Sequence, residues 1–149
     1  MQRKGSDKSA RRGDASKLSV GIAVARFNAD ITEVLLAAAR EELHAWKVKA
    51  ANVFIIHVAG SFELPFACQR LLQKKKVDVA IALGCIIKGE TKHDEYIAQA
   101  VFSALQQTSL KHDTPIGLGI LTVNSHSQAK KRINYGAAAA AAALEAALV

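Results

Sequence analysis

The stretch that decides the fold is VDVAIALGCII (residues 77–87), followed by KGETKHDE (88–95) and the segment YIAQAVFSAL (96–105). A nearly unbroken apolar run rich in valine and isoleucine predicts a strand that is covered on both faces of a sheet. The apolar residues that follow the polar segment recur at helical spacing, which predicts a helix beginning near His93. A buried strand that leads directly into a helix is typical of a parallel α/β sheet.

The same alternation of strand and helix occurs four times along the chain. We predict strands over residues 19–25, 53–59, 77–87 and 116–123, and helices over 31–46, 65–75, 93–110, 128–133 and 136–149. This order predicts a three-layer α/β fold, flavodoxin-like, in which a four-stranded parallel sheet is covered by helices on both faces. A small sheet has two edges to protect, and the alanine-rich last helix offers a flat apolar surface, so both features favour a homo-oligomer.

Three local signals suggest where helices begin and end. Asp30 with Glu33 three residues later resembles a capping box at the start of the first helix. Ser125 or Ser127 can cap the short basic helix near the C-terminus. We expect Gly136 to separate that basic helix from the alanine-rich helix.

Length and composition limit the class of protein. The chain has 149 residues, half of them hydrophobic, which suits one domain with a real core. It contains no apolar run of about 20 residues and no secretory signal, so we expect a protein without a membrane span. The cysteines Cys68 and Cys85 have no metal-ligand spacing with the histidines and are interpreted as buried thiols in a reducing cytoplasm.

Positive charge is concentrated at the N-terminus. Residues 1–17 carry six lysines and arginines and two aspartates, a balance of +4 within a formal net charge of +7. We predict a disordered basic tail over residues 1–16, followed by one domain over 17–149. A tail that touches RNA or another polyanion remains an alternative, although no aromatic residue is interleaved for base stacking. Nucleic acid is otherwise not expected as a partner.

Polar side chains follow each of the four predicted strands, in segments 26–28, 60–63, 88–93 and 124–126. In open parallel sheets, ligands bind beyond the carboxyl ends of the strands, so these segments should form one site. Taken singly, Phe27 could be a core residue, Glu63 could complement a helix dipole, and Thr91 could be a plain helix cap. Histidine is the side chain whose unperturbed pKa lies near neutrality, and His93 stands at the start of a helix whose N–H groups could hold a phosphate, so it could act as a proton shuttle.

Four motifs together resemble those of the 6,7-dimethyl-8-ribityllumazine synthase family. They are ARFNADI (25–31), AGSFELP (59–65), ALGCIIKGETKHDEYIA (82–98) and GILTVNSHSQAKKR (119–132). The resemblance implies a transferase of riboflavin biosynthesis that needs no cofactor and no metal. It would condense 5-amino-6-(D-ribitylamino)uracil with 3,4-dihydroxy-2-butanone 4-phosphate to 6,7-dimethyl-8-ribityllumazine, releasing phosphate and water.

The resemblance also implies roles for particular residues. His93 would transfer protons, and Phe27 would stack on the uracil ring. Glu63, with its neighbours, would hold the ribityl chain. The full set of implied uracil and ribityl contacts is Phe27, Ser61, Phe62, Glu63, Cys85, Ile86, Ile87 and Leu118, and the implied phosphate contacts are Glu90, Thr91 and Arg132.

Members of this family assemble as pentamers, many of them as sixty-subunit icosahedral shells, with the active site between adjacent subunits. Arg132 and Leu118 would then serve a neighbour's site. The chain departs from the family pattern at Asp94 and Leu118, where aromatic residues are usual, and in the shortened segment 133–136. These departures motivate one alternative, a weakly active or inactive shell-forming protein of the same fold. A flavodoxin-like module that binds flavin without turnover is a second, separate alternative.

Overall fold

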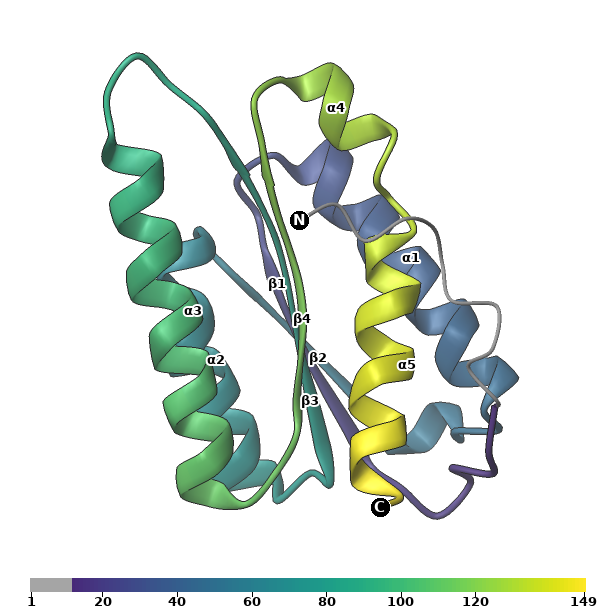
Figure 1. Cartoon of the computed structure of the whole chain (residues 1–149). Helices are drawn as coiled ribbons and strands as arrows, with labels where there is room; N and C mark the ends of the chain where they lie inside the picture. Colours follow the sequence, from purple (N-terminus) through teal and green to yellow (C-terminus); the bar gives the residue numbers. More distant parts are fainter. Residues whose placement is uncertain (1–11) are drawn as a thin grey trace.

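The structure is a computed structural model and describes residues 12–149, which form an α/β domain (Figure 1). Short helical turns connect some of the main elements: η1 (Ala50–Asn52), η2 (Ser61–Glu63) and the π-helical η3 (Leu71–Lys75). The strands and α-helices are β1 (Val20–Ala25), α1 (Ala29–Ala45), β2 (Val53–Val58), α2 (Leu64–Arg70), β3 (Val79–Ile87), α3 (His93–His112), β4 (Ile116–Val123), α4 (His126–Lys130) and α5 (Tyr135–Ala147).

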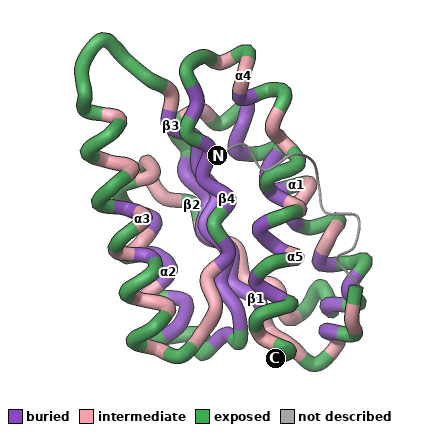
Figure 2. The backbone as a smooth tube through the Cα atoms, viewed as in Figure 1, coloured by how far each residue is buried: buried purple, intermediate pink, exposed green. Residues whose placement is uncertain are grey.

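The four strands form one parallel sheet in the order β2-β1-β3-β4, which confirms the predicted topology. Val20 of β1 is level with Val53 of β2 and with Val79 of β3, and Ala80 of β3 is level with Ile116 of β4. The two central strands, β1 and β3, are almost entirely buried (Figure 2), as their apolar sequences predict. The observed strand ends lie within two residues of the predicted ones.

Helices cover both faces of the sheet, so the three-layer prediction is also confirmed. Figure 1 shows α1 and α5 on one face and α2 and α3 on the other. A hydrophobic cluster fills each interface: one contains Ile22, Leu35 and Leu144, and the other contains Leu64 and Leu105. Because parallel strands point the same way, all their carboxyl ends reach the edge of the sheet near α4 and the loop before α3.

Gly136 does not separate two helices, and this prediction is wrong. It is the second residue of α5 and is buried where this helix crosses α1. A Cβ atom at Gly136 would lie 2.1 Å from the carbonyl oxygen of Leu35. The glycine therefore allows two helix backbones to approach closely, a requirement that local sequence signals do not reveal.

The predicted capping box at Asp30 is also wrong. Helix α1 begins one residue before Asp30, and its N-cap is Asn28, which has left-handed backbone angles (φ 61°) and makes no side-chain cap hydrogen bond. Asp30 instead lies against His126 of α4, with 2.5 Å between Oδ2 and Nε2, a contact that is an ion pair when the imidazole is protonated. The Ser125 alternative for the cap of α4 is confirmed, because its hydroxyl accepts a hydrogen bond from the Gln128 N–H.

The predicted disordered tail lies outside the described residues over positions 1–11. Within its last five positions, Arg12 and Ala15 contact α1 and the turn that follows it. Arg12 binds Glu42 through two hydrogen bonds of 3.0 and 3.1 Å, and Ala15 is buried beside Trp46. Contacts with the folded domain therefore begin before Lys17. Within residues 12–149, no helix is both long and apolar enough to cross a membrane.

Candidate functional site

A pocket of about 490 Å³ opens beyond the carboxyl ends of β1, β2 and β3. Segments that are far apart in the sequence contribute to its walls, because the parallel sheet brings their strand ends to one edge. The lining residues are Phe27, Ala59, Gly60, Ser61, Phe62, Glu63, Cys85, Ile86, Ile87, Gly89, Thr91, His93, Asp94 and Ile97.

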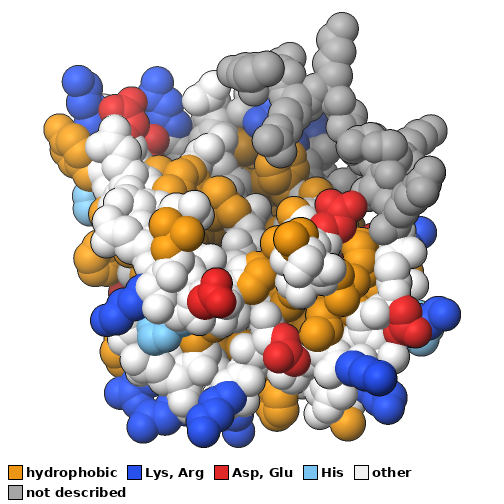
Figure 3. Space-filling view, turned by 60° about the horizontal axis from the view of Figure 1, so that its bottom comes forward, with side chains coloured by type: hydrophobic (Ala, Val, Ile, Leu, Met, Phe, Trp, Pro, Cys, Tyr) orange, Lys and Arg blue, Asp and Glu red, His pale blue; other side chains and the backbone are white. Residues whose placement is uncertain are grey.

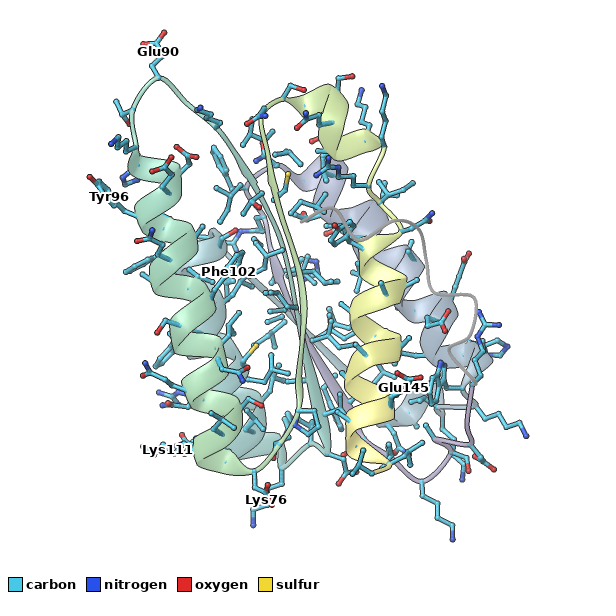
Figure 4. The ribbon with its side chains drawn as sticks, in the orientation of Figure 1. Lys76, Glu90, Tyr96, Phe102, Lys111 and Glu145 are labelled. Carbon is cyan, nitrogen blue, oxygen red and sulfur yellow. The ribbon has the colours of Figure 1, made fainter. Side chains whose placement is uncertain are left out.

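Nine of the twelve predicted site residues line this pocket, and Glu90, Leu118 and Arg132 do not. Glu90 lies at the tip of the loop between β3 and α3, and its side chain points away from the domain (Figure 4). Leu118 lies on the edge strand β4 with 47% of its surface exposed, and Arg132 follows α4. The three residues are therefore outside the pocket of their own chain.

Two aromatic side chains flank the pocket and are open to solvent. Phe27 is 71% exposed and Phe62 is 65% exposed, so the interpretation of Phe27 as a core residue is wrong. The backbone of Phe27 is nevertheless held in place, because its N–H donates to the carbonyl of Ala59 at 3.0 Å. A fixed backbone with an exposed ring provides a surface on which a flat ligand can stack.

The turn η2 places a hydroxyl and a carboxylate in the pocket wall. The Gly60 N–H donates to Oε2 of Glu63 at 3.0 Å, which fixes this carboxylate beside the strand end. Ser61 packs over Gly84 of β3, where an added Cβ would lie 2.6 Å from the serine Oγ. The absence of a side chain at Gly84 thus makes room for the hydroxyl of Ser61.

The end of β3 forms the floor of the pocket. Successive residues of a strand point to opposite faces, and Cys85 belongs to the cluster under α1 and α5 while Ile86 belongs to the cluster under α2 and α3. Burial, and to a lesser extent the charge of Asp30, raises the pKa of the Cys85 thiol to about 11. The thiol is therefore protonated at neutral pH and is a poor nucleophile.

His93 is the first residue of α3, and its backbone N–H donates to the hydroxyl of Thr91 at 3.3 Å. The N-cap of α3 is Lys92 and makes no side-chain cap hydrogen bond, so the interpretation of Thr91 as a plain helix cap is wrong. The imidazole of His93 is exposed at the pocket, where it can exchange protons with a ligand and with water.

Six further residues at this edge were given no individual role from the sequence. The Asn28 amide donates to the Cys85 carbonyl at 3.0 Å, and the others line the pocket: Ala59, Gly60, Gly89, Asp94 and Ile97. Asp94 and Ile97 are three positions apart and so share a face of α3, which is the signal that could have identified them. Among residues 12–149, no cluster of three or more histidine, cysteine or acidic side chains could hold a metal ion.

These features define an α/β protein with a small-molecule pocket at the carboxyl edge of a parallel sheet, containing an aromatic platform, a carboxylate and an imidazole. Comparison with known proteins agrees with this class. Residues 17–149 match the family model described as 6,7-dimethyl-8-ribityllumazine synthase, and the chain belongs to this family.

Several relatives carry the same name. The protein from Paracidovorax citrulli is 46% identical over 129 residues, which cover 86% of this chain and 84% of the relative. The protein from Thermus thermophilus is 40% identical, covering 88% and 87%. That from Parabacteroides distasonis is 39% identical, covering 80% and 74%. All three are named 6,7-dimethyl-8-ribityllumazine synthase.

Proposed function

We propose that this chain is an active transferase of riboflavin biosynthesis. It condenses 5-amino-6-(D-ribitylamino)uracil with 3,4-dihydroxy-2-butanone 4-phosphate to 6,7-dimethyl-8-ribityllumazine and releases phosphate and water. The observation that carries the proposal is the pocket itself, in which Phe27, Glu63 and His93 come together from three distant segments. Membership of the family supplies the identity of the reaction.

The side chains of the pocket suit this chemistry. Phe27 stacks on the pyrimidine ring, and Glu63, held by the Gly60 N–H, accepts hydrogen bonds from the ribityl hydroxyls. An amine of one substrate attacks the carbonyl of the other and water leaves. Phosphate is then eliminated, and the second ring closes when the other amine attacks the remaining carbonyl and a second water leaves. Each step moves protons without a change of redox state, so an imidazole such as His93 can assist them.

Much of the acceleration comes from holding two substrates together. A pocket that places an amine next to a carbonyl replaces a collision in solution by an intramolecular step. His93 then contributes an additional acid–base factor rather than the whole effect. Thr91 and Glu90, in the loop before α3, offer backbone N–H groups to the phosphate of the second substrate.

The active protein is a homo-oligomer in this proposal, with a pentamer as its basic unit and a sixty-subunit shell as its larger form. Leu118 and Arg132 lie outside the pocket of their own chain, and Leu118 is an exposed apolar residue on an edge strand. Both facts support a site that is completed by the neighbouring subunit. There Leu118 covers the uracil ring and Arg132 binds the phosphate.

The surface of the domain is also compatible with contacts between subunits. On the face shown in Figure 3, apolar side chains lie at the surface among scattered charged ones. Large apolar residues that are at least 40% exposed include Val34 of α1, Leu110 of α3 and Leu148 after α5. These residues are spread over different elements, so they are compatible with contacts between subunits without marking one interface, and a second copy of the chain is the partner that the family suggests.

A cytoplasmic location fits this assignment. Cys68 and Cys85 are free, buried thiols, as the sequence predicts, and unpaired cysteines are the rule in reducing compartments. The enzyme is preferred over a weakly active shell-forming protein because the pocket contains both the carboxylate of Glu63 and the imidazole of His93. The same pair argues against a module that binds flavin without turnover.

Mixing the two purified substrates with the protein tests the proposal. Formation of 6,7-dimethyl-8-ribityllumazine, followed by its fluorescence, is the expected result. A protein that forms stable assemblies and yet gives no lumazine above the uncatalysed rate would contradict it. Light scattering on the same sample measures the assembly size, and a monomer would contradict the proposed interfacial site.

A further inference from the structure

Helix α4 is short, and its own capping bonds do not attach it to the rest of the domain. The N–H of Asn124 donates to Oε1 of Gln128, and the N–H of Gln128 donates to Oγ of Ser125, so both bonds lie within the turn itself. These bonds shape α4 but do not fix its place on the sheet. A five-residue helix has little stability of its own, so its direction depends on contacts with neighbouring elements.

Ala129 and His126 hold α4 against the domain. Ala129 is fully buried in the cluster under α1 and α5. His126 reaches the first turn of α1, where its Nε2 lies 2.5 Å from Oδ2 of Asp30. Figure 1 shows α4 near the start of α1, at the carboxyl edge of the sheet. His126 and Ala129 are three positions apart and share one face of the helix, so together they fix its direction, whereas one small anchor would let α4 pivot.

The Nε2 atom of His126 depends on Asp30 for a polar partner. A carboxylate offers only acceptor atoms, so the imidazole presents an N–H at Nε2, in its neutral or its cationic form. This nitrogen is closed to solvent, and among the described residues the Asp30 carboxylate is its only polar contact. Removing the carboxylate would leave an enclosed donor without an acceptor, which is unfavourable. Helix α4 would then shift until water reaches the nitrogen.

Backbone hydrogen bonds connect α4 to Arg132. The N–H of Arg132 donates to the carbonyl of Ala129 at 3.0 Å, and the N–H of Tyr135 donates to the carbonyl of Arg132 at 3.1 Å. Arg132 thus lies in a continuous turn between α4 and α5. The α5 end of this turn is fixed where Gly136 packs against Leu35, and the other end follows α4. A change in the direction of α4 therefore moves Arg132.

We infer that His126 and Asp30 are positioning residues that act through Arg132. Their contact fixes the direction of α4, and α4 presents the Arg132 guanidinium to the phosphate of the substrate in the neighbouring subunit's site. The inference rests on the proposed function, because the phosphate contact of Arg132 belongs to it. It gives a role in the reaction to two side chains that lie outside the pocket of their own chain.

The experiment measures the KM of each substrate with the assembled protein. His126→Leu removes the N–H and should raise the KM of the phosphate-bearing substrate about threefold or more, while the KM of the uracil substrate stays unchanged. Asp30→Ala removes the acceptor and should have the same effect. His126→Gln places an amide N–H near the position of Nε2 and should restore most of the wild-type KM.

His57 supplies a matched control. Its Nε2 lies 2.9 Å from Oε1 of Glu33, so it makes the same kind of contact with α1 and is about as exposed as His126. It belongs to β2, the edge strand on the opposite side of the sheet from β4, whereas α4 packs against β3 and β4. His57→Leu should therefore change neither KM.

A double mutant tests whether His126 acts through Arg132. In an Arg132→Ala background, His126→Leu should add no further rise in KM, because the cation that it positions is gone. Equal rises in both backgrounds would overturn the inference, and so would an unchanged KM in both His126→Leu and Asp30→Ala. Loss of the oligomer in His126→Leu, seen by light scattering, would also overturn it, because the contact would then support assembly rather than the placement of Arg132.

Failure of the proposed function gives a different result. A folded wild-type protein that forms no lumazine would refute that function, and the inference would fail with it. An active wild type in which Arg132→Ala leaves both KM values unchanged would remove the role of Arg132 and of the two residues that position it. If Arg132→Ala raises the KM of the phosphate-bearing substrate and His126→Leu does not, the function stands and only the inference fails.

Discussion

The side-chain amide of Asn28 donates a hydrogen bond to the backbone carbonyl of Cys85, at 3.0 Å, across the carboxyl edge of the sheet. The regular pairing between β1 and β3 ends before this point, at Val24 and Leu83. Asn28 therefore takes the place of a strand partner for the end of β3. It also adopts the left-handed conformation that turns the chain from β1 into α1.

The two roles of Asn28 can be separated by two substitutions. Asn28→Gly keeps the left-handed backbone accessible but loses the amide, so we expect a loss of about 1–2 kcal/mol in the free energy of unfolding. Asn28→Ala loses the amide and adds backbone strain, and we expect a further loss of about 1 kcal/mol. Urea unfolding of both variants measures the difference. Equal stability of the alanine and glycine variants would show that the backbone angle is unimportant.

Gly136 provides a test of packing against helix propensity. Alanine is a better helix former than glycine by about 1 kcal/mol, so propensity alone predicts that Gly136→Ala stabilises α5. The added Cβ would meet the Leu35 carbonyl, a backbone atom that cannot move aside. We therefore expect destabilisation by about 1–3 kcal/mol, measured by urea unfolding. Gly89→Ala is the control, because nothing lies within 4 Å of its added Cβ, and its stability should be nearly unchanged.

Stability at acid pH should depend on Glu42. Hydrogen bonds from the Arg12 guanidinium and, less strongly, from the Trp46 indole lower the pKa of this carboxyl, while burial opposes them. A group whose pKa is depressed by folding adds stability above its ordinary pKa, here 4.5, and loses it as the pH falls through the folded-state value. A double-mutant cycle with Arg12→Met and Glu42→Gln, measured by urea unfolding from pH 7 to pH 3, should show a coupling that shrinks with acid. A coupling that stays constant over this range would argue against the predicted shift.

His93→Ala should slow turnover without abolishing it. The variant keeps both substrates in place and loses one acid–base group, so we expect kcat to fall about a hundredfold, the lower end of the usual range for such groups. Initial rates of lumazine formation measure this effect. His44→Ala, an exposed histidine of α1 outside the pocket, is the control. Full activity of His93→Ala with both substrates would exclude the proposed role.

An interfacial site predicts complementation between two impaired variants. Arg132→Ala should raise the KM of the phosphate-bearing substrate and leave the KM of the uracil substrate unchanged. When subunits of His93→Ala and Arg132→Ala are denatured together in equal amounts and reassembled, about a quarter of the interfaces would combine an intact His93 with an intact Arg132. The mixture should then be more active than either parent alone. Activity equal to the average of the two parents would place both residues in the same subunit's site.

The sequence by itself was sufficient for the layers of the fold and for most of the pocket. Buried strands such as β3 have nearly continuous apolar sequences, and apolar residues in the helices recur about every 3.6 positions. The local hydrophobic pattern therefore predicts the order of strands and helices. The polar segments after β1, β2 and β3 were also predicted to meet, because parallel strands bring their carboxyl ends to one edge. Residues as distant as Phe27 and His93 could therefore be assigned to one site.

Only the tertiary structure decided features that depend on the approach of distant segments. Gly136 looked like a helix boundary, but it lies where α5 crosses α1. A glycine is needed there because the Cβ of any other residue would meet the Leu35 carbonyl. Asp30 looked like a capping residue, but its carboxylate contacts the imidazole of His126. Asp94 looked like a departure from a motif, and its enclosed oxygen became evident only in the pocket. Local patterns record the period of burial along one element, whereas close contacts are set by the relative placement of two elements.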